Sequence, residues 1–175
     1  MSDIIGMGDK VILRRLNRND TDNIVKWRNS DTVMQRFIIR TPLTPEVHEN
    51  WIKTKIETGQ VEQFIIKIKE SGREIGSTYL KDIDKANGSA EYGIFIGESD
   101  EQGKGYGYEA QMLTLDYAFN TLGLKTIIIR VLYDNEASIA TGEKCGFKKI
   151  EGSDYEVMIE GKPRTVIFMQ INRGN

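Results

Sequence analysis

A glycine-rich turn at residues 101–110 has the composition of a phosphate-binding site. It follows an apolar run typical of a buried strand and precedes apolar residues at helical spacing. Lys104 adds a positive charge at the rim, and three glycines leave the backbone open to close approach by an anion: Gly103, Gly105 and Gly107. Because the first N–H groups of a helix also attract negative charge, the turn predicts a bound phosphate.

The order of residues in this turn separates it from two common phosphate-binding loops. Its pattern is Gln102-x-x-Gly105-x-Gly107. The dinucleotide fingerprint requires Gly-x-Gly-x-x-Gly in a first βαβ unit, and the NTPase loop ends in Gly-Lys-Ser/Thr. The phosphate is therefore expected to belong to another class of ligand.

The elements around this turn predict an α+β fold with a mixed, mostly antiparallel sheet of about seven strands and about four helices. Helices are expected from Asn19–Asp22 to Asn29, from the cap Thr44 toward Gly59, after the glycine turn, and between Asn135 and Gly146. Short polar turns join successive strands before the glycine turn, which indicates an antiparallel meander, and the helix after it indicates a parallel crossover. The expected strands cover 10–14, 63–69, 73–80, 90–96, 125–133, 147–150 and 165–171.

Length and composition predict one domain over residues 1–175 of an ordinary globular protein. The formal charge of −2 gives no electrostatic reason to expect nucleic acid or an anionic membrane as a partner. Cys145 is the single cysteine, so neither an internal disulfide nor a thiolate metal site is expected. The N-terminus lacks the features of a signal peptide, and a cytoplasmic protein is expected.

Two motifs together resemble the GCN5-related N-acetyltransferase (GNAT) superfamily. The first is the pattern Gln102-x-x-Gly105-x-Gly107, and the second is Asn135-x-x-Ser138-Ile139 followed by Glu143-Lys144-x-Gly146-Phe147. With the order of elements, the resemblance covers essentially the whole chain. It implies that the sheet splays between its fourth and fifth strands, at 92–96 and 127–133, and that acetyl-CoA binds in the gap as co-substrate, with no metal.

The resemblance also implies which residues hold acetyl-CoA. The pantetheine arm would pair with the backbone of the fourth strand, the pyrophosphate would lie on amides of the glycine turn, and two polar residues would face the thiol end. The implied cofactor-binding residues are Ile94, Phe95, Ile96, Gln102, Gly103, Lys104, Gly105, Tyr106, Gly107, Asn135 and Ser138.

Acetyl transfer to an amine requires loss of a proton, because an alkyl ammonium with a pKa near 10 is not nucleophilic. Glu91, at the start of the fourth strand, is the candidate general base, and a strand-end carboxylate in solvent is the alternative. Many relatives carry a tyrosine two residues before the Lys-x-Gly-Phe run, where it protonates the leaving thiolate, but this chain has Gly142 there. Tyr133 is the candidate substitute, and water is the alternative.

In this superfamily the N-terminal helices shape the acceptor pocket, which directs attention to Trp27, Arg28 and His48. Their surroundings resemble the branch that acetylates amino sugars carried on nucleoside diphosphates, as in the pseudaminic acid pathway. An arginine and a histidine suit a pyrophosphate. The alternatives are that Trp27 is part of the core, that Arg28 makes a local salt bridge and that His48 is solvated.

Three alternatives remain open at this stage. The chain also resembles the ribosomal-protein branch, so a protein N-terminus is an alternative acceptor, as is a polyamine such as spermidine. From a different class, a non-catalytic acyl-CoA-binding sensor is compatible with Gly142 at the usual tyrosine position. A homodimer is a further expectation.

Overall fold

A computed structural model describes residues 3–174, in which nine strands form one sheet. The order along the sheet is β1-β2-β3-β4-β5-β6-β9-β7, with β8 paired to β9, and only the β5–β6 pair is parallel. The strands are β1 (Ile4–Met7), β2 (Val11–Arg15), β3 (Glu62–Ile68), β4 (Glu74–Asp84), β5 (Ser89–Ile96), β6 (Thr126–Leu132), β7 (Lys148–Lys149), β8 (Tyr155–Ile159) and β9 (Lys162–Asn172).

Five α-helices accompany the sheet in the described residues, and their ends follow local capping chemistry. Thr44 accepts a hydrogen bond from the Val47 N–H, Asn135 accepts one from the Ser138 N–H, and Gly146 ends its helix with a φ of 103°. π-helical turns extend α3 over Ile52–Ile56 and α4 over Tyr117–Thr121. The helices are α1 (Thr21–Asn29), α2 (Asp31–Met34), α3 (Pro45–Trp51), α4 (Tyr106–Asp116) and α5 (Glu136–Cys145).

The predicted fold class is confirmed, and the structure adds two strands and one helix that the sequence pattern did not indicate. β1 has only 4 residues, one of them Gly6, which weakens the strand pattern. In β8 the exposure of successive residues alternates, but the exposed positions include the apolar Met158, so the sequence shows no regular alternation of polar and apolar residues. α2 has only 4 residues, too few for helical periodicity to be visible.

The two faces of the sheet are covered by different helices. On one face α4 and α5 pack over the larger core, whose members include Tyr92, Ala110 and Cys145. On the other face α1 and α3 pack over a smaller core that includes Trp27 and Phe95. Successive residues of β5 therefore face two separate apolar layers.

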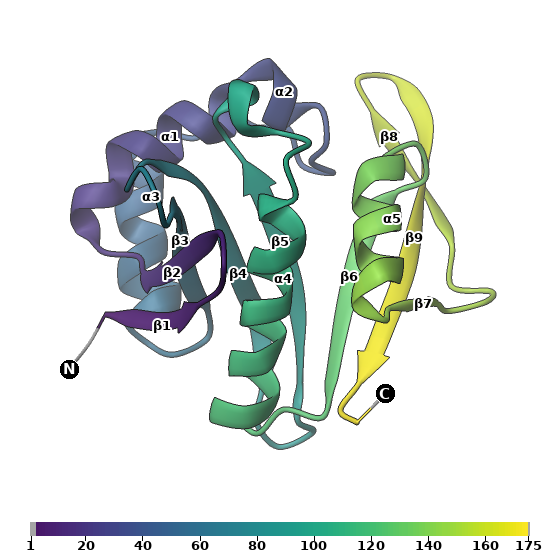
Figure 1. The fold of residues 1–175 in the computed structure, drawn as a ribbon. Helices are drawn as coiled ribbons and strands as arrows, with labels where there is room; N and C mark the ends of the chain where they lie inside the picture. Colours follow the sequence, from purple (N-terminus) through teal and green to yellow (C-terminus); the bar gives the residue numbers. More distant parts are fainter. Residues whose placement is uncertain (1–2, 175) are drawn as a thin grey trace.

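The sheet opens between β5 and β6, as the resemblance implied. The two strands pair only from Ser89 to Glu91 on β5 and from Thr126 to Ile128 on β6. Beyond Glu91 no strand of residues 3–174 pairs with the β6-facing edge of β5. In Figure 1 the strands lie together at the bottom and diverge toward the top, where the loop leading into α4 begins.

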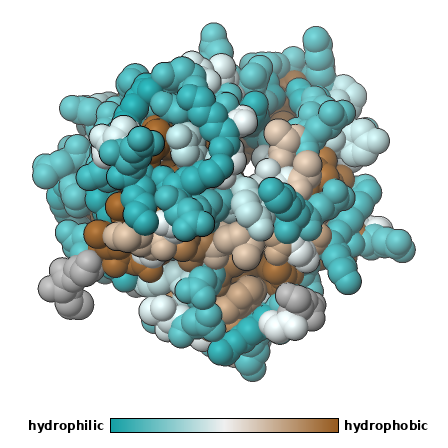
Figure 2. All heavy atoms as spheres, in the orientation of Figure 1, coloured by the Kyte–Doolittle hydropathy of each residue, from teal (hydrophilic) through white to brown (hydrophobic). Residues whose placement is uncertain are grey.

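The outer face of the molecule on the α4 side is partly apolar. Figure 2 shows hydrophobic residues gathered over the lower half of this face, and Ile4, Met7 and Met112 are among the exposed hydrophobic side chains of β1 and α4. Among the described residues, no helix combines the length and apolarity required to cross a membrane.

Candidate functional site

A cavity of about 580 Å³ occupies the gap between β5 and β6. Residues from α1, α2, α3, both strands, the glycine turn and α5 line it, so segments far apart in the sequence meet around one space. Most of the predicted site residues are part of this lining: Arg28, His48, Glu91, Ile94, Phe95, Ile96, Gln102, Gly103, Tyr106, Gly107, Asn135 and Ser138.

The glycine turn presents the N-terminus of α4 to the cavity. Gly105 is the N-cap residue, with a φ of 85° that side-chain-bearing residues rarely adopt, and no side chain caps the helix. Gly103 has a φ of 74° and open space where its Cβ would be. The first amides of α4 are thus free of side-chain partners, which suits a phosphate.

Side chains around the turn hold it in place. The Gln102 amide donates to the Ile96 carbonyl at 2.9 Å, which ties the turn to the end of β5. Lys104 pairs with Glu101 at 2.8 Å, so its ammonium already has a partner on the turn. Lys10, which no sequence motif indicated, donates to the Lys104 carbonyl at 3.3 Å and brings a second ammonium to this end.

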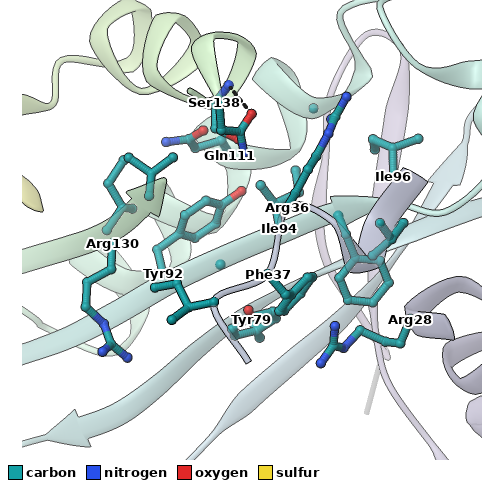
Figure 3. A pocket seen from close by; sticks show the side chains of 18 of the residues that line it. Arg28, Arg36, Phe37, Tyr79, Tyr92, Ile94, Ile96, Gln111, Arg130 and Ser138 are labelled. Atoms are coloured by element: carbon teal, nitrogen blue, oxygen red, sulfur yellow. Dashed lines mark hydrogen bonds between the residues drawn. The ribbon is translucent and has the colours of Figure 1, made fainter. Parts of the chain in front are cut away.

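On the face of the sheet covered by α1 and α3, Arg28 of α1 has no carboxylate partner among the described residues. The Arg28 guanidinium lies 3.5 Å from the ring centroid of Phe37, and Phe37 packs against Phe95 with ring centroids 6.0 Å apart. Burial lowers the pKa of Arg28 from its ordinary value, yet a guanidinium remains charged at neutral pH. Figure 3 shows Arg28 with Phe37 and Tyr79 on one side of the cavity.

The remaining charges in the lining are mostly paired with one another. Glu91 accepts a hydrogen bond from Arg130 at 3.0 Å and lies 3.5 Å from the Lys81 ammonium. Glu101 pairs with Arg73 and Lys104. Within the described residues the lining therefore contains no unpaired carboxylate, whereas Arg28 and Arg36 have no acidic partner.

His48 reaches the cavity from α3 in a buried setting. Its Nδ1 lies 3.0 Å from the Thr21 hydroxyl, and its Nε2 is buried without a hydrogen-bond partner. Burial lowers the pKa of His48 below its ordinary value, and the nearby Asp20 opposes this shift. The neutral imidazole therefore predominates near pH 7.

Three buried side-chain atoms of the described residues lack a hydrogen-bond partner, and all three belong to residues that line this cavity. They are His48 Nε2, the Tyr92 hydroxyl and Gln111 Nε2. An unsatisfied buried polar group costs about 1–3 kcal/mol, so folded proteins rarely contain them without a reason. Their concentration here fits a cavity that is completed by a polar ligand.

Four predicted residues are not part of the cavity lining: Lys104 and Gly105 belong to the glycine turn itself, and the other two, Trp27 and Tyr133, lie elsewhere. Trp27 is 1% exposed in the core between α1 and the sheet, and its indole N–H donates to Glu98 at 2.8 Å. Tyr133 is 66% exposed and borders a separate, shallow hollow with Asp134 and Arg164. The structure does not bring either side chain to the space between β5 and β6.

Sequence reasoning missed several lining residues: Arg36, Lys81, Tyr92, Gln111 and Arg130. Lys81 and Arg130 come from the strands on either side of β5, and only the register of the sheet places them beside Glu91. Tyr92 could have been found, because it directly follows Glu91 on the strand that borders the gap.

Comparisons with known proteins agree with this geometry. The model of the family described as acetyltransferase (GNAT) domain matches residues 10–148. The spermidine N(1)-acetyltransferase of Escherichia coli K12 is 31% identical, and the match covers 92% of this chain and 85% of that protein. An uncharacterized protein of Methanocaldococcus jannaschii is 32% identical over 83% of this chain, which spans only 29% of that protein.

Solved structures give the same result. The crystal structure of spermidine N-acetyltransferase from Vibrio cholerae in complex with CoA and spermine superimposes with a TM-score of 0.86 at 26% identity, covering 95% of this chain and 97% of that one. The fold that carries the glycine turn and the cavity is thus a known architecture. The chain belongs to the GNAT family of acetyltransferases, which use acetyl-CoA as the acetyl donor.

Proposed function

We propose that this enzyme transfers the acetyl group of acetyl-CoA to a primary amine of a small molecule. The observation that carries the proposal is the cavity itself, which runs from the uncapped N-terminus of α4 to the last β5–β6 pair at Glu91. A phosphate at the glycine turn and an extended arm along the free edge of β5 would bring a thioester to the inner end of the gap.

Backbone groups supply most of the proposed acetyl-CoA contacts. The amides from Gln102 to Gly107 would hold the pyrophosphate, with Lys104 and Lys10 at the rim, and the β6-facing edge from Ile94 to Ile96 would pair with the pantetheine arm. Asn135 and Ser138, at the start of α5, would face its thiol end.

Glu91 is the proposed general base. Its carboxylate is only 18% exposed, lines the cavity and is oriented by Arg130 and Lys81. Glu91→Gln should lower kcat by roughly 10²–10⁴ while the KM for acetyl-CoA stays near that of the wild type, because the amide cannot accept the ammonium proton. Since Glu91 also holds Arg130, the pH profile is the critical readout. A lost base gives a rate that climbs as the amine deprotonates in solution, whereas a uniform loss at every pH would assign Glu91 a positioning role only.

The acceptor has two candidates, each with its own support. The spermidine N-acetyltransferases among the relatives favour a polyamine. The charges of the cavity favour an amine that also carries an anionic group, such as an amino sugar linked to a nucleoside diphosphate. A polyamine needs carboxylates, and both lining carboxylates are paired, whereas Arg28 and Arg36 are available to an anion.

An acetyl-CoA consumption assay over nucleotide-linked amino sugars, polyamines and N-terminal peptides tests the proposal. If the acceptor is anionic, Arg28→Ala should raise its KM about tenfold or more, because a charge-assisted hydrogen bond contributes roughly 1.5–3 kcal/mol. If the acceptor is a polyamine, the same change should leave the KM level or lower it, since a repulsive charge is removed.

Arg18→Ala is the matched control, because Arg18 is an exposed arginine paired with Glu57 and is not part of the cavity lining. Both kinetic constants should be unchanged in this variant. Absence of turnover with every amine in the panel would contradict the proposed function.

A further inference from the structure

Two successive residues of β5 direct chemical groups to opposite sides of the strand. Glu91 faces the side of Arg130 and Lys81, and the neighbouring Tyr92 packs into the core under α4 and α5. This follows from the alternation of side chains along a strand. Acetyl transfer benefits from a base near the attacking amine and a hydrogen-bond donor near the leaving thiol, on opposite sides of the thioester. At the point where the sheet opens, β5 carries a carboxylate on one side and a hydroxyl on the other.

The Tyr92 hydroxyl is buried and has no hydrogen-bond partner, although Tyr92 lines the cavity. Figure 3 shows this hydroxyl directed to the side of the cavity on which Gln111 and Ser138 lie. The Gln111 side chain is 2% exposed, and its Nε2 is unpartnered as well. A phenol that satisfied only a packing role would be replaced without loss by phenylalanine, which has no polar group to bury.

Gly142 explains why such a group would come from β5 rather than from α5. A Cβ at Gly142 would lie 3.0 Å from Cδ1 of Ile129, a side chain of β6 that lines the cavity. A larger residue at this point of α5 would therefore require Ile129 to move. α5 has no side chain at position 142. Tyr92 of β5 packs near α5 instead, because Tyr92 and the α5 residue Cys145 belong to one cluster of side chains.

We propose that the Tyr92 hydroxyl donates a hydrogen bond to the sulfur of acetyl-CoA and stabilises the leaving thiolate. The inference rests on the proposed acetyl transfer. As the acceptor nitrogen forms its bond to the carbonyl carbon, the carbon–sulfur bond breaks and its electron pair moves to sulfur. The phenol keeps its proton and shares it in a hydrogen bond, the amine proton leaves toward Glu91, and the thiolate then takes a proton from water.

The surroundings of Tyr92 keep its hydroxyl protonated, which suits a group that donates a hydrogen bond without giving up its proton. Burial raises the pKa of Tyr92 well above its ordinary value, and the neighbouring Cys145 and Tyr79 add to this shift. Burial likewise raises the pKa of Cys145 to about 11 and that of Tyr79 to about 12. The three groups therefore stay protonated and uncharged over the pH range in which an ordinary thiol titrates.

Tyr92→Phe tests the proposal, with two readouts. The first is the ultraviolet titration of the thiol of bound CoA, which requires no acceptor. Loss of a donor to the thiolate should raise the pH at which this thiol ionises. The second is turnover: kcat should fall about tenfold to hundredfold with the KM for acetyl-CoA nearly unchanged, since the hydrogen bond strengthens as charge develops on sulfur.

Tyr117→Phe is the matched control. It removes a hydroxyl from another largely buried tyrosine, one that accepts a hydrogen bond from Arg15 at 2.8 Å and does not line the cavity. It should change neither readout. The thermal midpoint of Tyr92→Phe should equal or exceed that of the wild type, because an unsatisfied polar atom is removed. Replacement of Tyr92 by 3-fluorotyrosine keeps the ring and strengthens the donor, so the bound thiol should ionise at lower pH than in the wild type.

The outcomes separate this proposal from the proposed function. An unchanged thiol titration in both Tyr92 variants, with Tyr92→Phe turnover within about twofold of the wild type, overturns the role of Tyr92 and leaves acetyl transfer intact. A wild-type protein that binds CoA but acetylates no amine contradicts the proposed function. In that case the thiol titration still tests whether Tyr92 donates a hydrogen bond to the sulfur of CoA. A wild-type protein that does not bind CoA overturns both.

Discussion

At the scale of single residues, burial changes what His48 can contribute. Its surroundings lower its pKa, so the folded protein holds the imidazole neutral at a pH where the unfolded chain has begun to bind a proton. The stabilising contribution is complete above the unfolded value of about 6.5 and is lost as pH falls below it toward the lower, folded pKa. This opposes the use of His48 as a cation for an anionic acceptor and makes Arg28 the stronger candidate.

The pH dependence of stability checks this assignment. The thermal midpoint of the wild type should fall as pH is lowered from about 7 to 5, and His48→Gln should fall less over the same interval, because glutamine does not titrate. His48 is the single histidine of the chain, so no other imidazole contributes to the difference. Parallel curves for the two proteins would mean that the folded pKa of His48 is not lowered.

At the scale of elements, the N-terminal hairpin holds the start of α4. The Glu109 carboxylate, in the first turn of α4, accepts hydrogen bonds from the backbone N–H groups of Asp9, Lys10 and Val11 at 2.6–2.9 Å. A side chain at Gly8 would displace this carboxylate, because a Cβ there would lie 2.4 Å from the Glu109 carboxyl carbon. The uncapped amides of α4 are thus fixed from behind by β1 and β2 and open in front to the cavity.

Gly105 links this element to acetyl-CoA binding. Gly105→Val should raise the Kd for CoA about tenfold or more, a loss of about 1.4 kcal/mol, because a side chain would occupy the approach of the phosphate beside the Lys10 ammonium, 3.3 Å from the site of the Cβ. Calorimetry with CoA measures the change.

Gly123→Val controls for backbone strain. Gly123 has a φ of 70°, and nothing lies within 4 Å of its Cβ position. Both variants should lose stability, because valine is strained at positive φ, but only the Gly105 variant should lose CoA affinity. Equal CoA affinity in the two folded variants would contradict the prediction that the glycine turn binds the phosphate.

At the scale of the whole molecule, the two halves of the sheet, β1–β5 and β6–β9, are joined within residues 3–174 only by the short β5–β6 pairing, which we call the seam. β5 and β6 share three residue pairs, and α4 and α5 pack on the same face beyond them. The helices that would select the acceptor, α1 to α3, cover the opposite face. Donor and acceptor are therefore expected to enter from different faces and meet at the seam, where Glu91 lies.

Local patterns in the sequence were sufficient for most of the elements and for the family. The caps Thr44 and Asn135, the terminating Gly146 and the glycine turn depend on chemistry between residues a few positions apart, and all four are found in the structure. β8 was missed because one of its exposed positions is the apolar Met158, so its 5 residues show no alternation of polar and apolar types. Such patterns predict which element forms, and with the order of elements they indicated the superfamily.

Only the tertiary structure decided which side chains face the gap. Trp27 and Arg28 are adjacent in the sequence, yet a helix turns successive residues by about 100°, so one is core and the other lines the cavity. The pairing of Glu91 with Arg130 depends on the β5–β6 register, and the unpartnered Tyr92 hydroxyl depends on the packing of α4 and α5. These features arise between residues far apart in the chain, where periodicity and spacing carry no information about distance.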